Sequence, residues 1–291
     1  MKKVILTGIY LWATIALHGQ NTPKTLLWEV TKSGNRHTSF LFGTFHEVNP
    51  SFFQSLSNAV SKLQQSDIVY VEEKAAVTTS ASQHTQNPWN AEKWRAILDD
   101  KQEKIFKDFI KKADDSTYYT LSPLLLTLTT SRLYLTNFCE TETPFTELMD
   151  HYIEKSALNQ HKKTYSLDSP QQALLNHAAQ NFSRSQDSVY ASYCINFMKN
   201  MIDNNLSDCT FINTYKKLEI DYEFDKDIST NTISAPLLIE RNTKWIQILN
   251  EAFVSNNCFV AVGFRHLCYQ QGLIQQLRKL GYTVTPLPVY N

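Results

Sequence analysis

Short apolar runs separated by polar residues predict a β-hairpin near the start of the chain. Residues 26–31 and 38–42 are two such runs, and the polar residues 32–36 between them include Gly34. Runs of this length joined by a glycine-containing turn are typical of two antiparallel strands.

The apolar spacing then changes to that of a helix and back to that of a strand. Apolar residues recur at intervals of three and four from residue 52 to residue 63, and Ser51 stands where a helix N-cap is expected. Residues 68–71 are a compact apolar run and predict a third strand. The order of elements in this part is β-β-α-β.

The C-terminal part has a matching pattern. It predicts a helix over residues 237–253, a strand over 258–262, a helix over 272–280 and a strand over 282–285. Gly281 is placed to end the second helix in a left-handed conformation. Strands that alternate with helices predict an α/β fold with a central, mostly parallel mixed sheet flanked by helices.

The middle of the chain has a different character. Residues 77–86 are rich in Thr, Ser and Gln and predict a loop, and residues 91–230 read as a mainly helical insertion. One further short strand is expected at residues 165–167, ending at Asp168. We therefore expect residues 22–291 to form one α/β domain that carries a helical insertion between its two βα parts.

The N-terminus predicts export. Two lysines precede an apolar run over residues 4–17, and small or polar residues follow, so residues 1–19 are typical of a cleaved signal peptide. An uncleaved membrane anchor is the alternative, but the run is shorter than the roughly 20 residues that cross a bilayer. We expect a periplasmic or extracellular protein with no stable membrane insertion after cleavage.

Composition and charge exclude some partners. The 291 residues are 42% hydrophobic, enough for a substantial core, and the 28 basic residues equal the 28 acidic ones. A chain without net charge has no general attraction to nucleic acid, so we expect no nucleic-acid partner. Its five cysteines permit disulfides in an exported protein, their connectivity cannot be deduced from spacing, and at least one must stay free. Cys258, inside an apolar strand, is expected to be a buried thiol, and it could pair with Cys268 only if the fold brings them together.

Two strand ends carry the same motif. Gly43 and His46 follow the second predicted strand at the spacing Gly-x-x-His, and Gly263 and His266 follow the predicted strand at 258–262 at the same spacing. Glycine at a strand end allows a sharp turn or a close approach of another group. Since α/β sheets bind ligands at the carboxyl ends of their strands, both histidines are expected at one site.

Glu72 ends a third strand and joins this expected site. Two imidazoles and a carboxylate are a familiar ligand set for a divalent metal, so His46, His266 and Glu72 are predicted metal ligands and catalytic residues. Glu72 could instead be the general base that takes a proton from water. A third interpretation is purely structural, with each histidine hydrogen-bonded after its strand.

These motifs, with their order and spacing, resemble the TraB/GumN family, to which the Tiki membrane proteases are related. The similar segments span nearly the whole chain and comprise residues 27–30, 41–46, 145–157, 163–168, 240–242 with Trp245, 263–267, 272–274 and 281–284. The chain departs from the family at Asp168, where a glutamate is usual, and this puts a direct catalytic role of Asp168 in doubt.

The resemblance implies a metal-dependent hydrolase with manganese, zinc or cobalt as its metal and a peptide or protein as its substrate. Residue by residue, it places function on both histidines, both motif glycines and Glu72. Apart from the resemblance, Thr44, Arg241 and Arg265 are expected to bind substrate, since a guanidinium can clamp a carboxylate. For each arginine the alternative is a surface or salt-bridged side chain, and this alternative is favoured for Arg265. The alternative is a non-catalytic protein that binds haem, metal or peptide in the same cleft.

Overall fold

The computed structural model describes residues 23–74, 88–140, 145, 147–168, 171–231 and 235–291. The predicted signal peptide and the predicted loop at 77–86 lie outside these residues. Among the residues described, no helix combines the length and the apolar character that crossing a bilayer requires.

A six-stranded mixed sheet forms the centre of the described fold, with the strand order β4-β3-β5-β2-β1-β6. Strands β2, β5, β3 and β4 pair in parallel, whereas β1 is antiparallel to both β2 and β6. This confirms the predicted α/β class and the opening hairpin, in which Leu27 faces Phe42. The strands are β1 (Leu27–Thr31), β2 (Ser39–Thr44), β3 (Ile68–Val71), β4 (Lys163–Ser166), β5 (Cys258–Gly263) and β6 (Thr283–Leu287).

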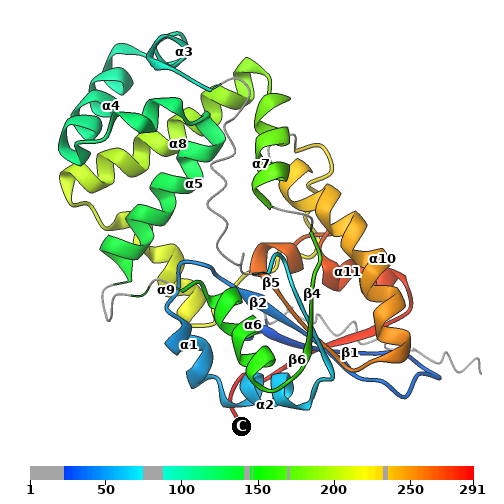
Figure 1. The fold of residues 1–291 in the computed structure, drawn as a ribbon. Coiled ribbons are helices and arrows are strands. Elements are labelled where there is room, and N and C mark those ends of the chain that lie inside the picture. Colours follow the sequence, from blue (N-terminus) through cyan, green and yellow to red (C-terminus); the bar gives the residue numbers. More distant parts are fainter. Residues whose placement is uncertain (1–22, 75–87, 141–144, 146, 169–170, 232–234) are drawn as a thin grey trace, which may run out of the picture.

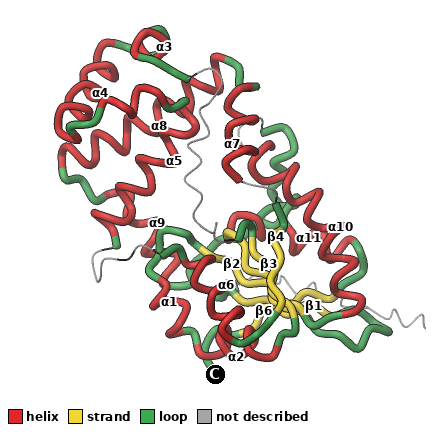
Figure 2. Tube along the Cα trace, in the orientation of Figure 1, coloured by secondary structure: helices red, strands yellow, loops and turns green. Residues whose placement is uncertain are grey.

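Helices cover both faces of the sheet (Figures 1 and 2). On one face, α1, α2 and α6 bury apolar side chains, and Phe42 of β2 packs against Phe53 of α1 with ring centroids 5.0 Å apart. On the other face lie α10 and α11, and Gly281 ends α11 with φ +82°, as predicted. The bounds are α1 (Pro50–Ser55), α2 (Ser57–Gln65), α6 (Met149–Asn159), α10 (Glu240–Ser255) and α11 (Leu273–Lys279).

The predicted helix after residue 50 differs from expectation in two details. It is divided into α1 and α2, because Leu56 leaves the helical conformation at φ −84° and ψ 79°. The cap is Asn49 and not Ser51, since the Asn49 side chain accepts a hydrogen bond from the Ser51 N–H at 2.9 Å. Pro50 at the first helical position has no N–H that needs a partner, which shifts the cap upstream.

The middle of the chain is mainly helical, and it contains the strand β4 at Lys163–Ser166, where a short strand was predicted over residues 165–167. In Figure 1, α3, α4, α5 and α8 stand apart from the sheet, around a second apolar core that includes Trp94 and Phe106. Residues 217–231 contain no helix, so the helical stretch ends before residue 230. The helices are α3 (Ala91–Arg95), α4 (Asp100–Ala113), α5 (Pro123–Tyr134), α7 (Gln171–Gln180), α8 (Arg184–Asp203) and α9 (Thr210–Lys216).

Helix α9 returns the chain to the sheet. The Tyr215 hydroxyl donates a hydrogen bond to the Gly43 carbonyl at 2.8 Å, and its ring packs against Phe45 and Phe264. A disulfide joins Cys139 to Cys209 just before this helix. Cys258 is a free, buried thiol, as predicted, and it does not pair with Cys268, which is also free.

Candidate metal centre

Four parallel strands deliver polar side chains to one edge of the sheet. Thr44 at the end of β2 lies in register with Gly263 at the end of β5. Beyond β3 and β4 the pairing continues, because the Asp168 N–H donates to the Glu72 carbonyl at 3.0 Å. His46 therefore follows β2, Glu72 follows β3, and the 3-10 helix Phe264–Leu267 places His266 after β5.

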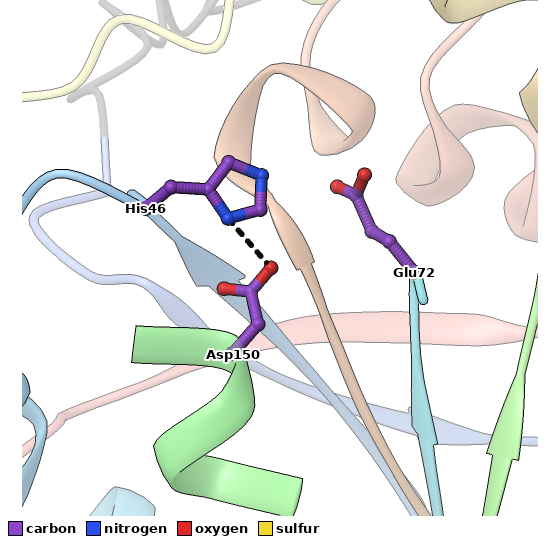
Figure 3. A group of neighbouring side chains, drawn as sticks. All are labelled: His46, Glu72 and Asp150. Carbon is purple, nitrogen blue, oxygen red and sulfur yellow. Dashed lines mark ion pairs between the residues drawn. The ribbon is translucent and has the colours of Figure 1, made fainter. Parts of the chain in front are cut away.

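Figure 3 shows three side chains that converge at this edge: His46, Glu72 and Asp150. Each offers one ligand atom, and these atoms all lie within 4.8 Å of one another. Asp150 belongs to the first turn of α6, and its Oδ2 lies 2.8 Å from His46 Nδ1. The carboxylates of Glu72 and Asp150 are buried, whereas the His46 side chain keeps 31% of its exposure. The group is thus reachable from solvent on the histidine side.

The chemistry of this group fits a divalent metal ion. Thr44 Oγ1 and Asp150 Oδ1 are buried and have no hydrogen-bond partner among the described residues. His46 Nδ1 is also buried, and its partner is the Asp150 carboxylate, with which it forms an ion pair at 2.8 Å when the ring is protonated. Unpaired polar atoms are costly in a protein interior, and one imidazole with two carboxylates suits zinc or manganese. The three residues could therefore hold a metal ion.

Charge governs the protonation of the metal-free group. Burial alone would lower the pKa of His46, but the facing Asp150 carboxylate, followed by Glu72 and Glu47, raises it to about 10. Burial alone would raise the pKa of Glu72, but the guanidinium of Arg241 and then the neighbouring imidazoles hold it below its usual range. The metal-free site therefore contains an imidazolium between two carboxylates.

Glu72 is anchored at both of its oxygens. The Gly263 N–H donates to Glu72 Oε1 at 2.6 Å, and Arg241 donates to Glu72 Oε2. A Cβ atom at position 263 would come within 3.0 Å of Oε1, so glycine permits this approach. At position 43 a Cβ would lie 2.8 Å from Cβ of Phe264, so each motif glycine makes room for a close contact at the shared edge.

His266 lies beside this group and not within it. Its Nδ1 is 2.7 Å from Asn242 Oδ1, and its Nε2 is 3.1 Å from an Arg241 nitrogen and 3.8 Å from Glu72 Oε1. Burial is the main reason that the pKa of His266 falls to about 3, so the ring is neutral. His266 is therefore not one of the three residues whose ligand atoms converge, and its Nε2 faces the Arg241 guanidinium.

The residues predicted to bind substrate occupy different surroundings. Thr44 is fully buried at the end of β2, and the Arg241 side chain is only 11% exposed. Arg265 is 42% exposed, donates a hydrogen bond to the Tyr269 hydroxyl and stacks over the Phe211 ring. Of the two arginines, only Arg265 has a surface that a substrate can reach.

Asp150 was not predicted to belong to the site, and a direct catalytic role was not expected of Asp168. An aspartate in the first turn of a helix is ordinary, because it interacts favourably with the helix dipole, so nothing in the residue pattern indicates that Asp150 faces a histidine. Asp168 accepts hydrogen bonds from Arg241 at 2.8 Å and from the Trp245 indole at 2.7 Å. The Asp168 side chain, although shorter than that of glutamate, therefore reaches Arg241, and Asp168 is not one of the three residues of the candidate metal group.

A cavity of about 630 Å³ lies elsewhere in the molecule. It is lined by residues that include Trp28, Tyr222, Phe224 and Arg278, and no member of the candidate metal group lines it. Its lining also contains charged side chains, among them Asp221, Glu223 and Lys226, so the cavity is a polar pocket separate from the candidate metal group.

The model of the TraB/PrgY/gumN family matches residues 26–286, nearly the whole chain. The matched range includes both Gly-x-x-His motifs, Glu72 and Asp150. No match was found among curated proteins or among solved structures.

Proposed function

This chain belongs to the TraB/PrgY/gumN family, and on that premise we propose that it is an exported, metal-dependent hydrolase that cleaves peptide bonds. The observation that carries the proposal is the convergence of ligand atoms from His46, Glu72 and Asp150 within 4.8 Å. Manganese, zinc and cobalt are the candidate ions. The peptide substrate rests on the resemblance to peptide-processing relatives, which is an analogy between sites and not a property of the fold.

His46, Glu72 and Asp150 would hold the ion in this proposal. A bound divalent cation lowers the pKa of coordinated water and polarises a carbonyl group. Glu72 has hydrogen bonds at both oxygens, so it serves as a fixed carboxylate and is a poor acceptor for a further proton. Asp150 Oδ1 has no partner among the described residues. It would take a proton from the water whose oxygen adds to the peptide carbonyl, and return that proton to the amine that leaves when the C–N bond breaks.

Arg265 would bind the substrate, and the buried Thr44 would line the wall of the site. The buried Thr44 hydroxyl has no partner among the residues described and lies at the same strand end as the motif. Arg265 presents a partly exposed guanidinium beside the second motif, 3.8 Å from the Glu223 carboxylate, and a substrate carboxylate would take the place of Glu223 there. The neutral His266 contributes no charge to the site and completes its buried wall.

Two observations support export. Residues 1–19 have the pattern of a signal peptide, and the Cys139–Cys209 disulfide is a bond that persists in oxidising compartments. Expression of the full chain in a bacterial host with an intact secretion system tests this point. Mass spectrometry of the exported product should show that residues 1–19 have been removed; an intact N-terminus in the cytoplasmic fraction would contradict export.

The enzymatic proposal is tested on the purified mature chain. Elemental analysis should find a divalent metal, and a peptide library should be cleaved in its presence and spared after chelation. His46→Ala and Asp150→Asn should both abolish cleavage, with His37→Ala and Asp108→Asn as matched controls outside the site. Metal binding without any cleavage would contradict the hydrolase and support the alternative, a non-catalytic binding protein.

A further inference from the structure

The guanidinium of Arg241 lies at the centre of a buried polar network. Its Nε donates to Asp168 Oδ2 at 2.8 Å, and one terminal nitrogen contacts Glu72 Oε2 and Asp168 Oδ2. The other terminal nitrogen contacts the Leu237 carbonyl at 3.3 Å and His266 Nε2 at 3.1 Å. These contacts join the ends of three strands to helix α10.

Most donors of this guanidinium have partners inside the protein. An arginine side chain has five N–H groups, and four of them make the hydrogen bonds described above. The remaining contact is an ion pair, in which the terminal nitrogen next to Glu72 also lies 2.7 Å from Asp168 Oδ2. The face of the guanidinium stacks on the Trp245 ring, 4.6 Å from its centroid. With these partners and 11% exposure, Arg241 is turned into the protein and away from a substrate carboxylate.

Asn242, the next residue of α10, determines how the His266 ring is protonated. Its amide nitrogen donates to the backbone carbonyls of His266 and Gln271 at 3.1 and 2.9 Å. Its amide oxygen therefore faces His266 Nδ1 at 2.7 Å and can only accept, so Nδ1 carries the hydrogen. The lone pair of Nε2 is then free to accept from Arg241.

Arg241 also determines the orientation of the Glu72 carboxylate. The backbone N–H of Gly263 holds one oxygen, and Arg241 holds the other. The plane of the carboxylate is thereby set by two donors from different elements. Asp168 keeps the guanidinium in place, because it accepts from Arg241 and from the Trp245 indole at the same time.

We propose that Arg241 is a positioning residue. It sets the orientation of the Glu72 carboxylate toward the ion and donates a hydrogen bond to Nε2 of His266. The effect of Arg241 on metal binding rests on the proposed function, whereas the hydrogen-bond network is present in the metal-free protein. Partners in this outer position orient the ligands of metal sites, and their loss typically lowers metal affinity about 10- to 100-fold.

The first test is nitrogen NMR of the metal-free wild type with labelled histidine, with the His266 signals assigned from a His266→Gln variant. We expect a neutral ring with hydrogen on Nδ1 and a hydrogen-bonded lone pair on Nε2. A ring with hydrogen on Nε2 would overturn the proposal, because Arg241 could not then donate to it. This measurement needs neither activity nor bound metal, so its result is independent of the proposed function.

The second test is titration of Mn²⁺, Zn²⁺ and Co²⁺ into Arg241→Lys. Lysine keeps the charge but loses the five-donor fork, so we expect affinity to fall about 10- to 100-fold. Arg278→Lys is the matched control, since Arg278 also stacks on aromatic rings, of Trp28 and Phe224, and lies away from the site. Wild-type affinity in a folded Arg241→Lys protein would overturn the proposal.

Asp168→Asn provides a second variant if Arg241→Lys does not fold. It removes one carboxylate partner of Arg241 and leaves the guanidinium and the ligands unchanged, so the Nε2 signal of His266 should shift and metal affinity should fall. No change in either measurement would overturn the proposal. If the wild type binds none of the three ions, the proposed function fails, while the NMR result still decides the role of Arg241.

Discussion

His46 Nδ1 lies 2.8 Å from Asp150 Oδ2, so the first turn of α6 meets the loop after β2 at the carboxyl edge of the sheet. The imidazole and the carboxylate come from distant parts of the chain and are brought together by the packing of α6 on the sheet. Glu72 approaches the same point from β3. A metal ion bound there would therefore link the His46–Asp150 pair to the central strands.

Asp150→Asn is expected to weaken metal binding by at least about tenfold. The amide keeps the shape of the side chain but removes the charge that a divalent cation needs from its ligand. Calorimetric titration measures the change, and Asp108→Asn, at an exposed position on α4, is the matched control. Unchanged affinity in Asp150→Asn would remove Asp150 from the site.

Metal binding is expected to release at least one proton near neutral pH. The pKa of His46 is raised to about 10 in the metal-free protein, so the ring is protonated at pH 7 to 8, whereas a metal ligand must be neutral. Affinity should therefore fall by about tenfold for each unit that the pH is lowered below 10, because each bound ion displaces one proton from His46.

Calorimetry in buffers of different ionisation enthalpy counts this released proton. The apparent binding enthalpy should vary with the buffer in the wild type. In Asp150→Asn the largest source of the raised pKa is gone, so the variation should shrink. A binding enthalpy that is the same in every buffer would show that His46 is already neutral.

Gly43→Ala is expected to lower the free energy of unfolding by about 1–3 kcal/mol. The added methyl group would lie 2.8 Å from Cβ and 3.1 Å from Cα of Phe264, and the backbone of the second motif cannot move away without disturbing the His266 contacts. Urea denaturation measures the loss. Stability equal to that of the wild type would mean that the two motifs are not in close contact.

Removal of the Cys139–Cys209 disulfide is expected to lower the free energy of unfolding by about 2–4 kcal/mol. The bond closes a loop with a sequence separation of 70 residues, and losing it frees the unfolded chain. Denaturation of a Cys139→Ser/Cys209→Ser protein measures the effect. A reducing agent should destabilise the wild type by a similar amount and leave the double variant unchanged; equal sensitivity of both proteins would contradict the bond.

Local pattern predicted most of the sheet and two of the three residues of the candidate site, His46 and Glu72. Apolar spacing located β1, β2, β3, β5 and β6, because burial on a sheet requires a run of apolar residues whatever surrounds it. The glycine before each motif histidine marked two strand ends, and parallel pairing brings such ends to one edge. The break at Leu56 was not predicted, since the apolar spacing continues through it.

The sequence by itself determined that His46, Glu72 and His266 each follow a strand, because an apolar run of strand length is a local property of the chain. Only the tertiary structure decided that Asp150 faces His46 and that Arg241 faces both Glu72 and His266. Those contacts depend on how α6 and α10 are set against the sheet. That placement is governed by the shape of the whole core and leaves no mark in the spacing of the residues concerned.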